Sequence, residues 1–246
     1  MKKKCTAIVL AAGQGKRMGA AVQKQYIELE EKPVIAYTLE QFNASRIIDD
    51  IVLVVGEDQK EYVQKEIVDR YGYDKVSAII PGGKERYHSV WEGLKCLSKK
   101  EESLEKELQT AYVFIHDGAR MFTDEEILER GFSTVERTGA CVAGMPSKDT
   151  VKIVDENHQV VDTPDRKSVW TIQTPQIFRK DLIVEAYKKY MRNENVFVTD
   201  DAMVVELMMD WSVEMFEGSY KNIKLTTPED LDIARIFLNK EKVQKN

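Results

Sequence analysis

Short apolar segments rich in β-branched residues alternate with longer segments of helical periodicity over the first part of the chain. Apolar runs of this length, bounded by glycine, proline or polar residues, predict strands. The helical segments between them place apolar residues on one face. Strands apolar on both faces and separated by helices are typical of a parallel sheet covered by helices on both faces. The predicted strands are 7–10, 50–55, 76–80, 111–115 and 140–145, and the predicted helices are 33–42, 59–71, 87–97 and 124–138.

A different pattern follows residue 146. Residues 149–155 and 159–162 alternate in polarity around the polar turn at 156–158, which predicts a β-hairpin. A lone hairpin has little core of its own, so we expect it to pack on another surface, most simply a second copy of the chain. The sequence therefore predicts a single α/β domain over residues 1–246 with a β-arm for dimerisation at 147–169.

In the last third of the chain, strand and helix patterns alternate again. We expect residues 170–178 to lead from the arm back into the main part of the domain. Residues 213–216 are predicted to form a short strand, and residues 179–189 and 199–209 are predicted to be helical. The segment 226–230 (TTPED) begins a final helix, with threonine at the cap and proline in the first position, which we expect to end near residue 239.

Composition and charge exclude several classes of protein. The 246 residues, 43% hydrophobic and 32% charged, suit one large globular domain, and no apolar run is long enough to span a bilayer or form a signal peptide. The three cysteines lie far apart without metal-binding spacing, which indicates a reduced, cytoplasmic protein. A net charge of −6 argues against nucleic acid as a partner. A phosphate ligand would need a local basic cluster.

A small-residue loop after the first strand offers such a cluster. Ala11, Ala12, Gly13 and Gly15 leave backbone N–H groups bare, and the cations Arg17 and Lys24 follow. Donors and positive charge together suit a polyphosphate. The loop lacks the Gly-Lys-Ser/Thr of a P-loop, and Met18 stands where a dinucleotide fingerprint has its third glycine. The segment alone is also compatible with an ordinary strand-to-helix turn with solvated charges.

Two further loops carry glycines, hydroxyls and charge directly after predicted strands. They are 82–89, with Gly83, Lys84, Arg86 and Ser89, and 116–120 (HDGAR). Ligands of such sheets bind beyond the carboxyl ends of the strands, so we expect the loops to share one site. Asp117 could accept a hydrogen bond from a ribose hydroxyl, bind Mg²⁺ or cap a turn. We expect His116 to be packed and hydrogen-bonded rather than catalytic.

A set of ordered motifs resembles the 2-C-methyl-D-erythritol 4-phosphate cytidylyltransferases over nearly the whole chain. The first motif alone is typical of sugar-nucleotide transferases in general, whereas the later ones are specific to this family. The motifs are 10–18 (LAAGQGKRM), 24–26 (KQY), 81–83 (PGG), 89–90 (SV), 116–120 (HDGAR), 149–152 (DTVK), 163–166 (TPDR), 173–176 (QTPQ), 199–202 (TDDA) and 222–231 (NIKLTTPEDL).

The resemblance implies a Rossmann-like nucleotidyltransferase fold whose two β-arms clasp into a homodimer. It implies an enzyme of non-mevalonate isoprenoid biosynthesis that joins CTP and methylerythritol phosphate, with Mg²⁺ as cofactor, and releases pyrophosphate. By motif position, Arg17 and Lys24 match stabilisers of the transition state, and Arg166 and Lys224 match the pair that positions the substrate phosphate. The resemblance also implies contacts to the nucleotide: Ala11, Ala12, Gly13 and Gly15 line it, Gly83 and Ser89 lie beside the cytosine, and Asp117 lies near the ribose. It implies that Arg120, Thr150 and Thr199 contact the substrate. Thr150 and Arg166 would reach the site of the other subunit.

The chemistry that such a reaction requires agrees with these roles. The attacking phosphate oxygen is already ionised, so no general base is needed, and positioning by fixed cations can supply catalysis. Three departures from the usual motifs are Gly118, Met121 and Lys84, which leave the rigidity of one loop and a contact to the base open. The alternatives are a ribitol 5-phosphate cytidylyltransferase, a dinucleotide-dependent oxidoreductase and a catalytically inactive scaffold.

Overall fold

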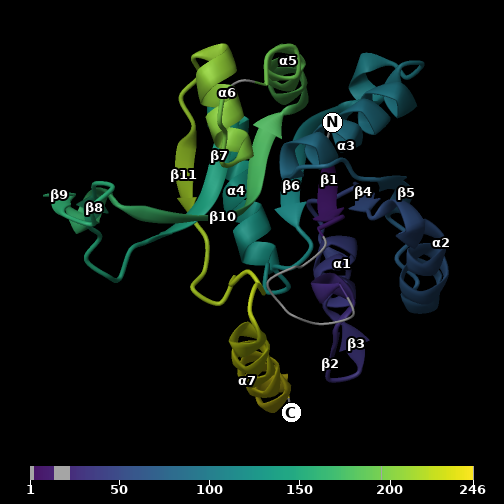
Figure 1. The fold of residues 1–246 in the computed structure, drawn as a ribbon. Helices are drawn as coiled ribbons and strands as arrows, with labels where there is room; N and C mark the ends of the chain where they lie inside the picture. Colours follow the sequence, from purple (N-terminus) through teal and green to yellow (C-terminus); the bar gives the residue numbers. More distant parts are fainter. Residues whose placement is uncertain (1–2, 14–22, 195, 246) are drawn as a thin grey trace.

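A seven-stranded sheet forms the centre of the molecule (Figure 1). The computed structural model describes residues 3–13, 23–194 and 196–245. The strand order is β11-β7-β10-β6-β1-β4-β5. The strands are β1 (Lys4–Ala11), β4 (Asp50–Val55), β5 (Val76–Pro81), β6 (Thr110–Asp117), β7 (Ala140–Pro146), β10 (Trp170–Arg179) and β11 (Glu214–Glu217).

The sheet is mixed rather than wholly parallel, which corrects the prediction. Strands β6, β1, β4 and β5 are parallel, as are β7 and β11, but β10 runs antiparallel to both β6 and β7. The chain leaves β7 through the arm and returns directly into β10 without a crossover helix, and a parallel return would require such a crossover. The hairpin that the sequence predicts is therefore also the reason why the next strand reverses.

Helices cover both faces of the sheet, as the apolar strands predicted. Helices α1, α2 and α4 pack on one face through residues such as Leu39, Val63 and Leu128. Helices α3, α5 and α6 pack on the other through residues such as Leu94 and Ile183. The helices are α1 (Val34–Ala44), α2 (Lys60–Val63), α3 (Arg86–Glu101), α4 (Glu125–Thr138), α5 (Lys180–Tyr190), α6 (Asp201–Met209) and α7 (Pro228–Lys245).

Several helix ends differ from the prediction. The predicted helix 59–71 is a short 3₁₀ turn (Glu57–Gln59), then α2, then a π-helical stretch (Gln64–Asp69). Helix α7 begins at Pro228 as expected but continues to Lys245, beyond residue 239. Gly139 ends α4 with a φ of 79°, which confirms the expected left-handed cap. None of the helices in the part of the chain that the structure describes is long and apolar enough to cross a membrane.

Tight packing explains two residues of the β6–α4 loop. A Cβ atom on Gly118 would lie 2.6 Å from Cδ1 of Ile35 and 2.9 Å from the Leu10 carbonyl oxygen, so glycine fits where a larger residue would have to displace a neighbour. Met121 is 2% exposed and belongs to a third apolar cluster with Leu225 and α7. Both contacts hold the loop against the rest of the domain.

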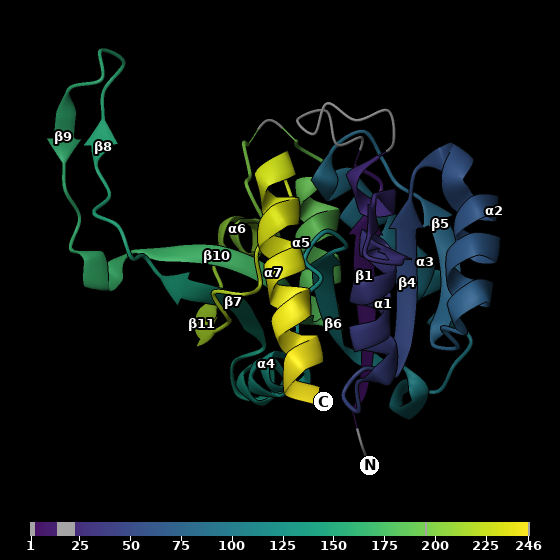
Figure 2. The ribbon, with the colours of Figure 1, turned by 90° about the horizontal axis from the view of Figure 1, so that it is seen from below.

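The arm extends away from the body (Figure 2). Its two short strands, β8 (Ile153–Val154) and β9 (Val160–Asp162), pair antiparallel, as the alternating pattern predicted. Apolar side chains on the arm remain exposed, by 49% at Ile153 and 61% at Val161. A hairpin with this much exposed apolar surface and no core is only marginally stable by itself.

Candidate functional site

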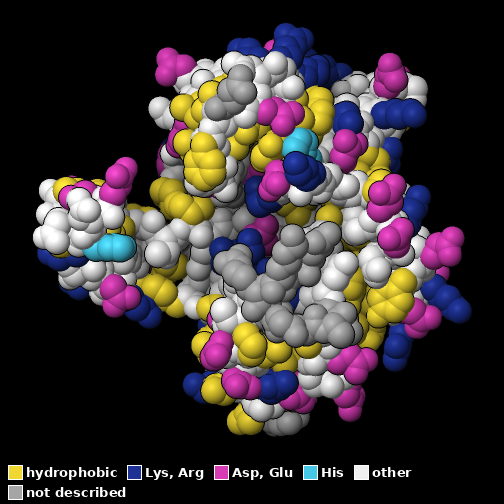
Figure 3. Space-filling view, viewed as in Figure 1, with side chains coloured by type: hydrophobic (Ala, Val, Ile, Leu, Met, Phe, Trp, Pro, Cys, Tyr) yellow, Lys and Arg dark blue, Asp and Glu magenta, His cyan; other side chains and the backbone are white. Residues whose placement is uncertain are grey.

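One cavity of about 610 Å³ opens at the carboxyl ends of β1, β5 and β6. This is where the sequence predicted a shared site, and the volume falls in the range of small-molecule pockets. Figure 3 shows acidic and basic side chains meeting in the hollow of this face. The cavity is lined by Leu10, Ala11, Ala12, Gly13, Lys24, Gln25, Gly83, Lys84, Glu85, Arg86, Ser89, Asp117, Ala119 and Lys224.

Close backbone packing brings the first two loops together. A Cβ atom on Gly82 would lie 2.4 Å from Cβ of Ala12 and 2.7 Å from Oγ of Ser89, so only glycine lets the loop after β5 reach the loop after β1. The Gly83 N–H donates to Oγ of Ser89 over 3.1 Å. These contacts align bare backbone from two loops along one wall of the cavity.

Gln25 connects the glycine-rich loop to the segment that carries Lys24. Its Nε2 donates to the carbonyl oxygens of Ala11, at 2.6 Å, and Gly13, at 3.2 Å. Gln25 is buried in a 3₁₀ turn (Lys24–Tyr26), and Lys24 lines the cavity. Arg17 and Gly15, the other predicted site residues of this region, lie outside the described residues.

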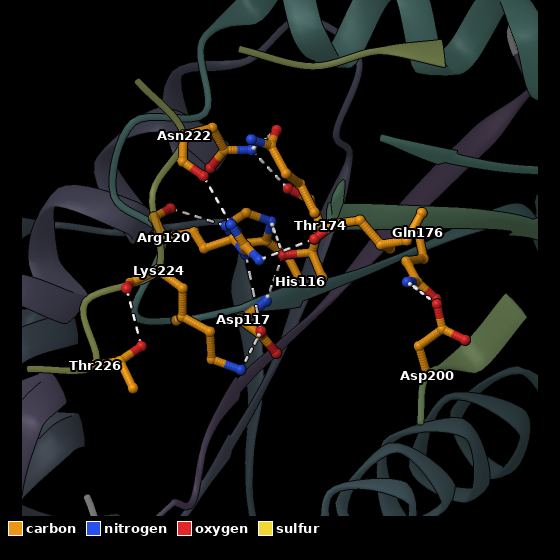
Figure 4. Close-up of polar contacts among 12 residues, drawn as sticks. His116, Asp117, Arg120, Thr174, Gln176, Asp200, Asn222, Lys224 and Thr226 are labelled. Carbon is orange, nitrogen blue, oxygen red and sulfur yellow. Dashed lines mark hydrogen bonds and ion pairs between the residues drawn. The ribbon is translucent and has the colours of Figure 1, made fainter. Parts of the chain in front are cut away.

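Asp117 lies at the centre of a cationic cluster (Figure 4). Its carboxylate is 2.8 Å from Nζ of Lys224, 3.2 Å from Nε of Arg86 and 4.0 Å from Nε of Arg120. Burial by itself would raise the pKa of Asp117, but Arg86 and Lys224 outweigh it and hold that pKa well below the usual range. Asp117 is therefore ionised and holds the cations in a fixed arrangement at the cavity.

Arg86 is a site residue that sequence analysis placed in the loop without assigning it a role. Its two terminal nitrogens donate to both carboxylate oxygens of Asp201, at 2.9 and 2.8 Å, while Nε donates to Asp117. The sequence did contain a feature that points to an anionic partner for Arg86. Arg86 is the first residue of α3, and a cation at the positive end of a helix dipole is unfavourable unless an anion compensates for it.

Asn222 fixes the segment that carries Lys224. Its fully buried side chain donates to the Thr174 carbonyl oxygen, at 2.8 Å, and accepts from Oγ1 of Thr123, at 3.2 Å. Its own carbonyl oxygen accepts from Nη1 of Arg120 over 2.7 Å. Because Lys224 follows two residues later, this network sets its position beside Asp117 (Figure 4).

His116 is packed beneath the site rather than exposed in it, as the sequence predicted. Its Nε2 donates to the Arg120 carbonyl oxygen at 3.0 Å, and its Nδ1 accepts from Oγ1 of Thr174 at 3.1 Å. The second contact requires the neutral ring, because a protonated Nδ1 cannot accept a hydrogen bond. Burial lowers the pKa of His116 from 6.5 to about 4.

Acidification should therefore destabilise the fold through His116. Between about pH 6.5 and 4 the unfolded chain binds a proton that the folded chain does not, so the free energy of unfolding falls as the pH falls, by up to about 3 kcal/mol in total. Thermal unfolding at pH 7 and 5 should show a smaller loss of Tm in His116→Gln than in the wild type. The control is His158→Gln on the exposed arm turn, which should keep the wild-type pH dependence. Equal pH dependence in His116→Gln would contradict the assignment.

Comparison with known proteins identifies the family. A family model described as 2-C-methyl-D-erythritol 4-phosphate cytidylyltransferase matches residues 5–240. The chain belongs to this family. It is 47% identical to the cytidylyltransferase of that name from Lachnospira eligens, over 95% of this chain and 98% of that protein, and 44% identical to the one from Alkaliphilus oremlandii, over 96% and 95%.

Solved structures of the cytidylyltransferase family share the fold. The 4-diphosphocytidyl-2C-methyl-D-erythritol synthase of Anaerococcus prevotii superposes with a TM-score of 0.82 at 34% identity, covering 97% of each chain. The Francisella tularensis cytidylyltransferase superposes with a TM-score of 0.74 at 28% identity, covering 94% of this chain and 98% of that one. Family and fold therefore agree with the resemblance inferred from the motifs.

Four predicted cytidylyltransferase site residues that the structure describes do not line the cavity. One is Arg120, whose Nη1 donates to the Asn222 carbonyl oxygen instead. Thr199 is exposed just before α6, whose N-cap is Asp200. Thr150 and Arg166 lie exposed at the base of the arm, where Nη1 of Arg166 donates to the Lys148 carbonyl oxygen at 3.4 Å. In this single chain the arm projects away from the cavity, so the two arm residues stay predictions that depend on a second subunit.

The residues around Asp117 do not fit a divalent metal ion held by the protein. Three cations already face this carboxylate, and a fourth positive charge would be repelled. Among the described residues, no group of three or more His, Cys, Asp or Glu side chains could hold a metal ion. Asp117 therefore serves as the partner of the protein's own cations.

Proposed function

We propose that this chain joins CTP to 2-C-methyl-D-erythritol 4-phosphate, forming 4-diphosphocytidyl-2-C-methyl-D-erythritol and pyrophosphate in non-mevalonate isoprenoid biosynthesis. The observation that supports the proposal most directly is the cavity at the carboxyl ends of β1, β5 and β6, where bare loop backbone meets Lys24 and Lys224. Membership of the cytidylyltransferase family supports the choice of substrates. It argues against an oxidoreductase, and the cations at the cavity argue against an inactive scaffold.

The reaction needs two anions brought together and charge spread over a five-coordinate phosphorus. The glycine-rich loop and the Gly83–Ser89 contact form a wall of backbone donors for the nucleotide. Lys24 and Lys224 both line the cavity and offer positive charge to it. Since the attacking phosphate oxygen is already ionised, these groups act by positioning and electrostatic stabilisation. We assign a neutral, structural role to His116.

The test supplies the purified chain with CTP and either methylerythritol phosphate or ribitol 5-phosphate and measures the release of pyrophosphate. We expect release with methylerythritol phosphate and at least a hundredfold lower kcat/KM with ribitol 5-phosphate. The reverse preference would transfer the proposal to the ribitol alternative. No release with either polyol phosphate would contradict the proposed function.

We propose that Mg²⁺ is the cofactor and that the oxygens of the CTP triphosphate, rather than Asp117, hold it. Magnesium in nucleotide enzymes is bound mainly through substrate phosphates and water, with few protein ligands. Chelation with EDTA should abolish pyrophosphate release. The half-saturating Mg²⁺ concentration should be the same in Asp117→Asn as in the wild type, although kcat falls. A large rise in that concentration would instead make Asp117 a metal ligand.

We propose that two copies form a homodimer through the arm, with Thr150 and Arg166 entering the partner's site. The exposed apolar side chains of the arm support this, since contiguous apolar surface marks an interface. The cytoplasmic location inferred from the cysteines stays a prediction.

The arm variant Val161→Asp should dissociate the dimer, because it places a charge in an apolar interface. Sedimentation equilibrium should then give the monomer mass, and kcat should fall at least tenfold because each site loses its partner's residues. The matched control is Val243→Asp, at a side chain of α7 that is 77% exposed. It should change neither the mass found in sedimentation equilibrium nor kcat. A monomeric wild type, or a fully active monomeric variant, would overturn the dimer proposal.

A further inference from the structure

The Arg86 side chain joins three elements that are separate in the sequence. It begins α3 and reaches Asp117 at the end of β6 and Asp201 at the start of α6. Three of the five N–H donors of its guanidinium are used in these contacts, at 3.2, 2.9 and 2.8 Å. A fork of this kind fixes the direction of both carboxylates as well as their distance.

Asp201 forms a rigid anchor for this guanidinium. Its side chain is fully buried, and its Oδ1 also accepts from the Tyr187 hydroxyl at 2.6 Å. Its backbone N–H donates to Oε1 of Gln176 at 3.0 Å. Both oxygens of Asp201 are thus occupied by Arg86 and one also by Tyr187, so Asp201 has little freedom to move.

Asp117 links Arg86 to Lys224. One of its oxygens faces Nε of Arg86 and the other faces Nζ of Lys224. The exposed fraction is 11% for the Asp117 side chain and 36% for Lys224. Without Arg86, the Asp117 carboxylate would keep Lys224 and the longer contact with Nε of Arg120, at 4.0 Å, and both of these face the same oxygen. Its other oxygen, which Arg86 now holds, would no longer fix the rotamer.

We propose that Arg86 is a positioning residue, which transmits the rigid geometry of Asp201 through Asp117 to Lys224 and so aims the Lys224 ammonium into the cavity. The proposal rests on the cytidylyltransferase activity proposed above for its kinetic readout. Loss of Arg86 should lower kcat more than it raises KM for CTP. A displaced Lys224 ammonium weakens the stabilisation of the transition state more than the binding of CTP.

The experiment compares the wild type with Arg86→Lys and Asp201→Asn in the pyrophosphate assay, well below each variant's Tm. Lysine keeps the charge but cannot bridge two carboxylates as the guanidinium does. We expect kcat to fall at least tenfold in each variant, with KM for CTP within threefold of wild type. The double variant should be no slower than the slower single variant, since both changes break the same chain of contacts.

Arg137→Ala is the matched control. Arg137 also forms a two-pronged ion pair with a carboxylate, that of Glu214, but on the surface of α4 and away from the cavity. It should leave kcat unchanged. A purely structural role for Arg86 would lower the Tm and leave kcat of the folded variant at the wild-type value, and that result would overturn the proposal.

A crystal structure of Arg86→Lys gives a readout that does not depend on activity. We expect Asp117 to change rotamer and Nζ of Lys224 to move away from its wild-type position. If both stay in place, the positioning role is wrong whatever the kinetics. If the wild type shows no turnover while the variant shows the displacement, the proposed reaction fails and the positioning of Lys224 by Arg86 stands.

Discussion

Replacing Lys224 with alanine should lower kcat/KM for pyrophosphate release by about thirty- to a thousandfold, which corresponds to about 2–4 kcal/mol of transition-state stabilisation. Lys224 contributes the ammonium that lies at the cavity 2.8 Å from Asp117. Its removal takes away one preorganised positive charge. Among the described residues, it leaves Asp117 with the ion pairs to Arg86 and Arg120. The remaining carboxylate charge then faces the incoming phosphates and repels them.

The measurement is steady-state kinetics with each substrate varied in turn. Lys221→Ala is the matched control, because Lys221 lies three residues earlier on the same segment with an exposed side chain and does not line the cavity. It should retain the wild-type kcat/KM. If kcat/KM of Lys224→Ala lies within threefold of the wild-type value, Lys224 is not a catalytic residue.

Asn222→Ala should give the second large effect, a loss of about 2–4 kcal/mol of folding free energy, because buried hydrogen-bonding groups are left without partners. The partners that lose a contact are the Thr174 carbonyl oxygen, Oγ1 of Thr123 and Oε1 of Gln173. For a chain of this size the loss corresponds to a decrease in Tm of about 5–15 °C. The activity should fall as well, since the segment that carries Lys224 is released.

Thermal unfolding followed by circular dichroism measures this effect. The control is Asn239→Ala on the exposed face of α7, which removes an amide without breaking a buried network. It should change the Tm by less than about 2 °C, as surface substitutions usually do. A Tm of Asn222→Ala within the same limit would show that water or a neighbour replaces the amide.

The local pattern of the sequence predicted the elements and their common edge. The alternation of apolar and helical segments located six of the seven strands of the central sheet within a few residues, including β4 with both of its ends. Residues 170–178 were expected to return to the domain but were not assigned as a strand, and they form β10. The loops after β1, β5 and β6 do meet at one cavity. These features follow from hydrophobic periodicity and from the geometry of parallel strands, both of which are encoded over short stretches.

Other local predictions were wrong at element boundaries. The last helix extends further than expected, and the helix after β4 contains a π-helical stretch. Helix ends depend on capping and packing contacts that periodicity does not report. The arm was recognised from its alternating pattern, but its effect on the direction of β10 required the path of the chain through the sheet.

The sequence by itself determined the class of fold, the glycine-rich loop and the types of side chain at the site, because each depends on neighbours a few positions apart. Only the tertiary structure decided which charges pair. Arg86 and Asp201 lie 115 positions apart, and Thr123 and Asn222 lie 99 apart, so no local pattern connects them. Their contacts exist because β6, α3, α6 and the segment before α7 converge at one edge of the sheet. That convergence, rather than any single motif, places Lys224 beside Asp117.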